Sequence, residues 1–451
     1  MKRIMLGLGA TLAIVSVVAA DSARSETRSA AERGAEAVRG RPALNPPAVS
    51  VEGFDNLWKH WGLKEKPANY VQAVRERYGL HEAPYDNAGL PMGLHPARGL
   101  FGKGFGTDCL LCHAGAVAGQ TIVGVGNTTL DLHGLLNDCL ASSSLGRGPN
   151  FPLAYTRGTI DPVTPFIVLM SMRDAEMEVI SPVPLDMPKR GICSDPPAWW
   201  QLKKKKIRDW TGAVDARAAR LDMVNILNPF NSGDFVKKHE SVYVDVHAFV
   251  MSVPAPKYPF PVDAKRVAQG EELFKEHCAR CHGTYGEKWT YPDKVVPLDK
   301  IGTDPLLAES FFGRNLEHYN KSWMAQEKDP EGKPFVVSDT RGYQAPPLDG
   351  VWATAPYFHN GSVPTVYHVL NSKARPKVFT RSFGTGKEDY DPEKLGLRFT
   401  AVKTPDPQAS GFELRKVYDT TQPGRDNGGH NFGDDFTEDE RLAMIEYLKT
   451  L

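Results

Sequence analysis

The sequence has little of several features that would assign it to a class directly. Only six of its 451 residues are cysteines, too few for a disulfide scaffold of this length. Its 54 basic and 54 acidic side chains cancel, which excludes a nucleic-acid binder that relies on general electrostatic attraction. After the first 20 residues no uninterrupted apolar run approaches 18 residues, so we expect no membrane span in the mature chain. With 41% hydrophobic and 24% charged residues, the composition is that of a globular chain with two or three domains.

The first 20 residues have the layout of a secretory signal peptide. Lys2 and Arg3 give a positive start, an apolar run extends from Ile4 to Val18, and small residues end the segment. This order is typical of a cleaved export signal, and about 15 apolar residues are short for the alternative, a retained membrane anchor. We therefore expect a periplasmic or secreted protein from which residues 1–20 have been removed.

A proline-rich stretch divides the rest of the chain. Residues 253–262 alternate proline with apolar and aromatic residues, a composition typical of a linker. We expect one domain over 54–252 and a second over 263–451, preceded by an N-terminal arm at 21–53. Glycine and proline together make up about 17% of the chain, above the usual share of about 12%, which indicates long loops.

Helical patterns are more frequent than strand patterns. Apolar residues recur at helical spacing within 54–78 and 263–277, and Thr437 with Glu440 forms a capping box before a C-terminal helix. Residues 80–108 are rich in glycine and proline and are predicted to be loop. Because no alternating pattern lasts long enough for a large sheet, the predicted fold class is mainly α with long loops.

Four of the six cysteines belong to two copies of one motif, C-x-x-C-H. This motif attaches haem c: the two thiols form thioether bonds with the porphyrin, and the next histidine binds the iron. About 0.002 copies are expected by chance from the composition of this chain. We therefore expect two covalently bound haem c groups. The predicted anchors are Cys109, Cys112, Cys278 and Cys281, and the predicted proximal iron ligands are His113 and His282.

Other uses of these cysteines are less consistent with the pattern. A thiol redox pair does not need the histidine, and a zinc site would need the two distant Cys-x-x-Cys pairs to fold together. Cys139 and Cys193 remain outside the motifs. Disulfides persist in exported proteins, so either a Cys139–Cys193 disulfide or two buried free thiols is consistent with the sequence.

The group opposite each proximal histidine decides what the haem does. A second histidine or a methionine gives a six-coordinate electron-transfer haem, whereas an open position binds peroxide or dioxygen. His430 lies in a glycine-flanked loop before the C-terminal helix, and His133 follows the first motif by 20 residues. Spacing alone does not choose between these histidines and ordinary hydrogen-bonding residues.

The segment 345–365, APPLDGVWATAPYFHNGSVPT, resembles the bacterial di-haem cytochrome c peroxidase superfamily, and most closely its rubber-oxygenase-like branch. Arg375-Pro376 and Gly429-His430 also fit that branch. The resemblance extends over about 260–451 and is weaker before it. It implies two cytochrome c-like domains with one haem each, a reactive N-terminal haem and a C-terminal relay haem that takes His430 as its second ligand. His359 would then pack near the relay haem and fix its loop by hydrogen bonds.

The resemblance leaves the catalytic pocket open. Weak candidates for the first haem site are His133, Glu176 and Phe230, and Trp58, Trp61, Trp199 and Trp200 are candidates for a tryptophan between the haems. The favoured function is a secreted haem-dependent oxidoreductase that acts on peroxide, dioxygen or an organic substrate, with a small redox protein as electron partner. The alternatives are a pure electron carrier with two six-coordinate irons and an enzyme that oxidises a partner protein over a distance.

Overall fold

The structure, a computed structural model, describes residues 28–99, 102–143, 148, 151–188 and 191–451. The predicted export signal lies outside the described residues. The fold is mixed, with 34% helix and 13% strand. Helix is the more frequent element, as predicted, but the strands make the fold mixed and not mainly α. Among the described residues, no helix is both long and apolar enough to cross a membrane.

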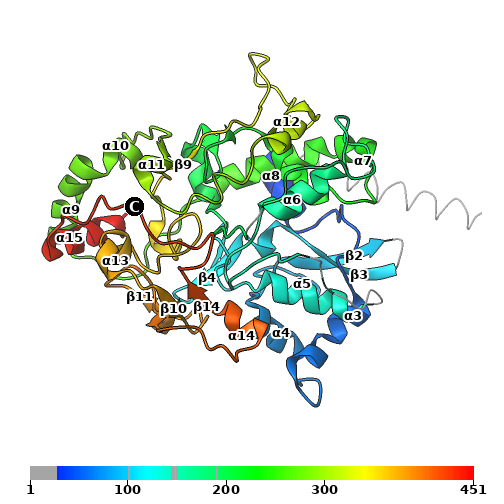
Figure 1. The fold of residues 1–451 in the computed structure, drawn as a ribbon, viewed down its shortest axis with the longest axis horizontal. Helices are drawn as coiled ribbons and strands as arrows, with labels where there is room; N and C mark the ends of the chain where they lie inside the picture. The colour runs from blue at the N-terminus through cyan, green and yellow to red at the C-terminus, as the bar shows by residue number, and fades with distance from the viewer. Residues whose placement is uncertain (1–27, 100–101, 144–147, 149–150, 189–190) are drawn as a thin grey trace, which may run out of the picture.

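The α-helices are short and connected by long loops (Figure 1). In chain order they are α2 (Ala30–Val38), α3 (Val51–Asp55), α4 (Tyr70–Tyr78), α5 (Leu132–Ala141), α6 (Val163–Ser171), α7 (Gly233–Lys238), α8 (Glu240–Ser252), α9 (Ala264–His277), α10 (Ala279–His282), α11 (Leu298–Ile301), α12 (Arg314–Lys321), α13 (Val366–Val369), α14 (Gly411–Arg415) and α15 (Glu438–Leu448). The chain also has short 3₁₀ segments: η1 (Leu57–Trp61), η2 (Cys109–Leu111), η3 (Trp199–Lys204), η4 (Ala219–Ile226), η5 (Val351–Ala353), η6 (Ser372–Ala374) and η7 (Lys387–Asp389).

The strands form small antiparallel sheets of two or three members, with orders β1-β3-β2, β13-β10-β14, β4-β5, β6-β7, β8-β9 and β11-β12. Strands this short leave no lasting alternation in the sequence. Their bounds are β1 (Val49–Ser50), β2 (Leu94–Gly99), β3 (Gly102–Thr107), β4 (Ala114–Val117), β5 (Gln120–Val123), β6 (Ile207–Arg208), β7 (Val214–Asp215), β8 (Val295–Pro297), β9 (Gly342–Gln344), β10 (Val378–Thr380), β11 (Tyr390–Asp391), β12 (Gly396–Leu397), β13 (Thr400–Ala401) and β14 (Val417–Asp419).

The prediction that residues 80–108 are loop is confirmed for 80–93 but was wrong beyond them, because β2 and β3 form a hairpin there. Ala97 pairs with Gly104, and Gly104 also pairs with Ser50 of β1. A Cβ atom on Gly104 would lie 2.2 Å from the carbonyl oxygen of Val49. The glycines therefore serve close strand contact, a role that glycine sometimes has inside strands, and their frequency was misread as a loop signal.

Two of the sequence predictions for helices are confirmed. Asp263 caps α9 by accepting from the main-chain nitrogens of Lys265 and Arg266, and α9 extends to His277 as expected. Thr437 and Glu440 form the predicted capping box of α15. The stretch 54–78 is less regular than expected, since α3, η1 and α4 share it.

Two helix pairs cross at glycines, and each pair belongs to one half of the chain. Within the predicted N-terminal arm, α2 packs on α8, where a Cβ on Gly34 would lie 1.9 Å from the carbonyl oxygen of Asp245. In the second half α9 and α15 lie side by side (Figure 1), and a Cβ on Gly270 would lie 2.0 Å from the carbonyl oxygen of Ala443. Both crossings are therefore close backbone contacts that a larger residue would disturb.

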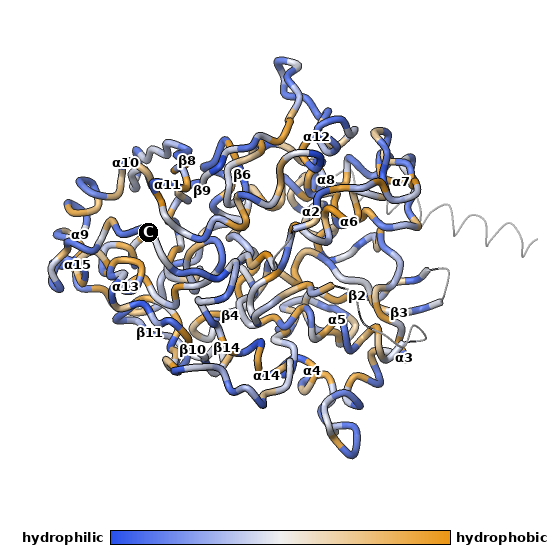
Figure 2. The backbone as a smooth tube through the Cα atoms, viewed as in Figure 1, coloured by the Kyte–Doolittle hydropathy of each residue, from blue (hydrophilic) through white to orange (hydrophobic). Residues whose placement is uncertain are grey.

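The two halves share one hydrophobic core. The largest cluster of buried side chains takes Trp200 and Met223 from the first half and Tyr319 and Trp352 from the second. Figure 1 shows α12, from the second half, beside α6, with which it is in contact. Figure 2 shows hydrophilic residues at the tip of the loop that projects beyond α12. The predicted linker 253–262 has no helix or strand. The division into two domains remains a prediction.

Cys139 and Cys193 are both free and buried. Cys139 packs in a separate cluster with Leu57 and Leu135, whereas the thiol of Cys193 donates to the hydroxyl of Thr159 at 3.1 Å. The structure thus favours two buried thiols over the disulfide that the sequence had left open.

Candidate functional site: two C-x-x-C-H cavities

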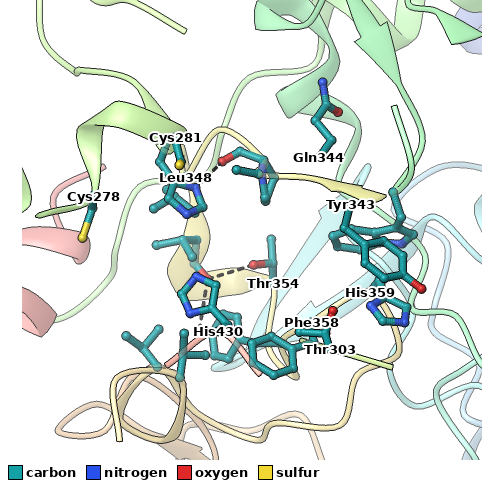
Figure 3. A pocket seen from close by; sticks show the side chains of 18 of the residues that line it. Cys278, Cys281, Thr303, Tyr343, Gln344, Leu348, Thr354, Phe358, His359 and His430 are labelled. Carbon is teal, nitrogen blue, oxygen red and sulfur yellow. Dashed lines mark hydrogen bonds between the residues drawn. The ribbon is translucent and has the colours of Figure 1, made fainter. Parts of the chain in front are cut away.

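The second C-x-x-C-H motif lies where α9 ends and α10 begins. The close contact between α9 and α15 at Gly270 fixes the direction of α9. This helix continues directly into Cys278. The motif lines a cavity of about 200 Å³. Figure 3 shows Cys278 and Cys281 at one side of this cavity, so both thiols are available to one bound group.

His282 is held in one orientation by the main chain. Its Nδ1 lies 2.8 Å from the carbonyl oxygen of Pro346. A carbonyl only accepts hydrogen bonds, so Nδ1 carries the proton and Nε2 keeps its lone pair, which is the state that binds a metal. Burial lowers the pKa of His282, opposed by the Pro346 carbonyl, so the ring is neutral near pH 7.

His430 lies across the same cavity from His282 and comes from the loop before α15. The centres of the two rings are 6.3 Å apart. The backbone of His430 is left-handed, with φ of 48°, and Arg375 holds this loop by donating to the carbonyl oxygens of Asn427 and Gly429 at 2.7 Å each. Among the described residues, the buried Nδ1 of His430 has no hydrogen-bond partner.

This pair of rings fits a six-coordinate haem iron. An imidazole nitrogen binds a metal at about 2.0–2.1 Å, and its ring centre lies about 1.1 Å behind that nitrogen, so two opposed ligands place their ring centres about 6.3 Å apart. Burial, and next the nearby His282, lower the pKa of His430 to about 3, so the lone pair remains free. The residues present therefore match the donor set of a haem c with two histidine ligands.

His359 lines the second cavity without facing His282 as a ligand. Its ring stacks on Tyr343 with centres 4.0 Å apart and an angle of 13°. The loop that it was predicted to fix is held instead by Asn360, which donates to the carbonyl oxygens of Gly424 and Asp426. The Nε2 of His359 has no partner in the part of the chain that the structure describes.

The first C-x-x-C-H motif has the same proximal arrangement. Asp108 caps the turn η2 by accepting from Leu110 N at 2.9 Å. His113 Nδ1 donates to the carbonyl oxygen of Pro197 at 3.2 Å, and its ring stacks on Trp199 with centres 5.2 Å apart. Burial, partly offset by the Pro197 carbonyl, lowers the pKa of His113 to about 4. Its Nε2 is therefore also ready to bind a metal.

The far side of the first cavity differs. This cavity measures about 610 Å³, and of its described lining residues only His113 is a histidine and none is a methionine. Part of its wall is apolar, formed by Ile160, Val163, Phe166, Leu221, Val250 and Phe311. With the described residues alone, an iron bound to His113 would therefore keep an open position.

Charged side chains face this open space. Arg208 makes a bidentate pair with Asp222 at 2.7 and 3.2 Å, and Lys205 and Asp209 line the same cavity. Desolvation raises the pKa of Asp209 and lowers that of Lys205 to about 8. Asp209 also has a left-handed backbone, with φ of 69°, a conformation that is uncommon outside glycine and is frequent at functional sites.

A thin wall separates the two cavities. Pro196, Pro197, Ala198 and Trp210 line both, and the Trp210 indole donates to the carbonyl oxygen of Asp195 at 2.7 Å. Sequence reasoning missed Trp210 because it considered other tryptophans. A signal was present, since the two Pro-Pro pairs at 196–197 and 346–347 supply the carbonyls that orient His113 and His282.

The weak catalytic candidates lie elsewhere. His133, Glu176 and Phe230 are absent from the described lining of either cavity. Glu176 is exposed and pairs with Lys237, and Phe230 is 64% exposed. The zinc alternative also lacks support, because the two Cys-x-x-Cys pairs line different cavities and no group of three or more His, Cys, Asp or Glu in the described chain could hold a bare ion.

Comparison with known proteins places a family match in the second half. Residues 342–380 match the family model described as RoxA-like, cytochrome c-like. The uncharacterized protein y4iM of Sinorhizobium fredii is 30% identical over 311 residues, which cover 59% of this chain and 66% of that protein. The uncharacterized protein y4iJ of the same organism is 31% identical over 248 residues, covering 42% of this chain and 39% of that protein.

The matched segment is the one that surrounds the second cavity. It contains Pro346, which orients His282, and Tyr343 and His359, which line the cavity wall. The matches span just under two thirds of one curated relative and well under half of the other. Residues 342–380 of this chain are a RoxA-like cytochrome c-like domain, and such a domain implies at least one haem c.

Proposed function

We propose that the protein is an exported di-haem c oxidoreductase in which the two haems have different tasks. The haem at Cys109 and Cys112 would have an open position for peroxide or dioxygen, and the haem at Cys278 and Cys281 would relay electrons. The observation that supports this division is the far side of each cavity: His430 stands opposite His282, whereas no described residue on the lining of the first cavity offers a second histidine or methionine.

The residues of the first cavity suit an oxidising reaction. An iron with a free position supplies the chemistry of binding and activating peroxide or dioxygen. Pro197 keeps the His113 ring in the tautomer that donates its Nε2 lone pair. Asp209 lines the cavity, and desolvation raises its pKa against the opposing charge of Arg208, which favours its use in proton transfer there. The apolar wall limits the entry of water.

The wall between the cavities supports electron exchange. Trp210 and Pro196–Ala198 touch both spaces, so the two haems would be separated by about one layer of side chains. The chain supplies no span for membrane anchoring among its described helices, and c-type haem attachment occurs outside the cytoplasm. We therefore propose a periplasmic or secreted location and a small redox protein as the electron partner.

A cyanide titration tests the proposal. The haem content is first measured as pyridine haemochrome, with two haems per chain expected. Cyanide should then bind one haem of the oxidised or half-reduced protein and leave the other unchanged. If neither haem binds cyanide in any redox state, both irons are six-coordinate and the protein is an electron carrier.

A further inference from the structure

Unpaired polar atoms collect at one end of the second cavity. Within the described residues, Thr303 Oγ1, Gln344 Oε1, His359 Nε2 and Asp195 Oδ1 are buried and have no hydrogen-bond partner, and all four residues line this cavity. Their exposures are 8%, 3%, 4% and 5%. A buried polar atom without a partner is unfavourable, so four in one place indicate a missing polar group.

The position of these atoms matches the chemistry of haem c. Figure 3 shows Thr303, Gln344 and His359 across the cavity from Cys278 and Cys281. Haem c is tied to its two cysteines along one edge, and its two propionate carboxylates leave the opposite edge. The polar end of the cavity therefore receives carboxylates when a haem is attached to the motif.

The donors and acceptors at this end do not match two ionised carboxylates. The Gln344 Nε2 donates to Ile207 O at 3.0 Å and to Asp293 Oδ1 at 3.2 Å, which uses both its protons and leaves Oε1 as an acceptor only. An ionised propionate also only accepts. Thr303 and His359 can each donate one hydrogen bond to a propionate. The Oε1 of Gln344 and an ionised Asp195 can only accept, and ionised propionates also only accept. A hydrogen bond between a propionate and either residue therefore needs an additional proton.

We propose that this polar end, formed by Thr303, Gln344, His359 and Asp195, binds the two propionates of the haem and keeps one proton among them. Thr303 and His359 donate to the carboxylates, and the retained proton joins a propionate to Gln344 or Asp195. The proposal rests on the proposed function because it requires a haem at Cys278 and Cys281. It adds that Asp195 contacts a propionate of that haem.

The electrostatics agree with this assignment. Burial raises the pKa of Asp195 well above its usual range, opposed only by Arg381, and burial lowers the pKa of His359 to about 3. Both shifts favour the neutral form, so the cluster favours keeping a proton at Asp195 or on the propionate beside it. The charged or titratable groups around it are Arg381 beside Asp195, Tyr343 stacked on His359, Asp293 behind Gln344, Asp304 next to Thr303, and His277 and Arg280 at the cysteine end.

The retained proton links the second haem to pH. When the iron takes one electron from a reductant in solution, the cluster takes one proton from water, because the proton is held more tightly beside an iron with one charge fewer. No other bond forms or breaks. The electron affinity of this haem should then fall tenfold for each unit that the pH rises, over part of the range from pH 5 to 9. For a one-electron couple this is a fall of 59 mV in the midpoint potential per pH unit.

Two substitutions should move this dependence in opposite directions. Asp195→Asn replaces a carboxylate with an amide that can donate to a propionate. The retained proton should then be released at least tenfold more easily, and the pH range in which the potential depends on pH should move to lower pH. His359→Leu removes a donor, so the proton is held more tightly and the slope moves to higher pH. Asp161→Asn is the control, because Asp161 is a buried aspartate that caps α6 and lines neither cavity.

The measurement is a spectroelectrochemical titration of the low-spin haem of the full chain at several pH values, after haem content has been determined. A chain without haem at Cys278 and Cys281 overturns this inference together with the proposed function. A chain that carries both haems but shows a pH-independent potential, or equal shifts in Asp195→Asn and His359→Leu, overturns only this inference and assigns the unpaired atoms to water.

Discussion

The two C-x-x-C-H sites are nearly the same on one side of the expected iron and differ on the other. In each, a histidine donates its Nδ1 proton to a proline carbonyl, and burial keeps the ring neutral. Beyond that, one cavity measures about 200 Å³ and has His430 opposite His282, whereas the other measures about 610 Å³ and is lined by six charged side chains: Asp108, Lys205, Arg208, Asp209, Asp222 and Asp339. The motif supplies the proximal histidine and a distant proline carbonyl orients it in both sites, whereas the far side differs because different segments form it.

The difference also concerns how charge is managed. At the second cavity, burial favours the neutral forms of Asp195 and His359, and the arginine beside Asp195 is Arg381. At the first, Arg208 is paired with Asp222 while Lys205 and Asp209 face the cavity. A relay haem gains from a fixed, dry environment, whereas a reacting haem needs groups that supply charge and protons.

Removing His430 should have the largest effect, because it gives the second site an open position like the first. His430→Ala is expected to convert the second haem completely from low spin to high spin and to let it bind cyanide, measured by optical and EPR titration. His133→Ala is the control, since His133 lines neither cavity in the described chain. A second haem that stays low spin in His430→Ala would show that another ligand holds it.

The second largest effect is expected from a larger residue at Gly270, where α9 crosses α15 beside the second motif. Gly270→Ala places a Cβ about 2 Å from a backbone oxygen of α15, and we expect a loss of about 3 kcal/mol in the free energy of unfolding. Gly34→Ala should be similarly destabilising at the α2–α8 crossing. Only Gly270→Ala should also lower haem content, because α9 continues directly into Cys278.

The matched control for both crossings is Gly411→Ala. The nearest atom to a Cβ there is the end of the Arg415 side chain, at 3.6 Å, so a change within about 0.5 kcal/mol is expected. Urea unfolding and pyridine haemochrome assays check all three variants. Equal haem content in Gly34→Ala and Gly270→Ala would contradict the link between the α9 crossing and the second motif.

The charge pair of the first cavity predicts acid sensitivity. Burial alone would raise the pKa of Asp222, but Arg208 and His247 outweigh it and bring the pKa to about 2. The group is more acidic folded than unfolded, so it contributes about 2 kcal/mol above pH 4, and this is lost as the pH falls from about 4 to 2. Asp222→Asn should lose about that much at pH 7 and show a flatter acid profile, measured by urea unfolding. An unchanged acid profile would show that other carboxylates cause the acid loss.

The smallest effect on stability is expected at the wall between the cavities. Trp210→Phe removes one hydrogen bond to the Asp195 carbonyl and should cost about 1 kcal/mol, with no change in the spin state of either haem. Electron equilibration between the haems, followed after flash reduction, should slow. Trp289→Phe, at an exposed tryptophan, is the control, and equal rates in both variants would remove Trp210 from the electron path.

The features that could be predicted from the sequence are local. The two C-x-x-C-H motifs, the helical spacing within 263–277 and the Thr437–Glu440 box each depend on residues that lie near one another in the sequence. His430 was reached only through the resemblance, since nothing in its loop marks a ligand. The structure adds the 6.3 Å separation from His282, which spacing could not supply.

What was missed depends on long-range contacts. Asp209 and Trp210 follow a run of four lysines at 203–206, which marks no site in the sequence, and only the folded chain brings them to the first cavity. The wall of that cavity also includes Phe311 and Tyr319 from beyond the predicted linker, so a division by composition did not predict which segments meet. The β2–β3 hairpin was missed because its glycines serve packing.

The most direct measurement is the EPR spectrum of the fully oxidised protein with both haems attached. The asymmetry of the cavities predicts two signals of equal spin concentration, one high-spin or weakly ligated ferric haem and one low-spin haem with two histidines. Addition of cyanide should convert only the first. Two low-spin signals that are insensitive to cyanide would contradict the assignment of the first cavity as an open, reacting site.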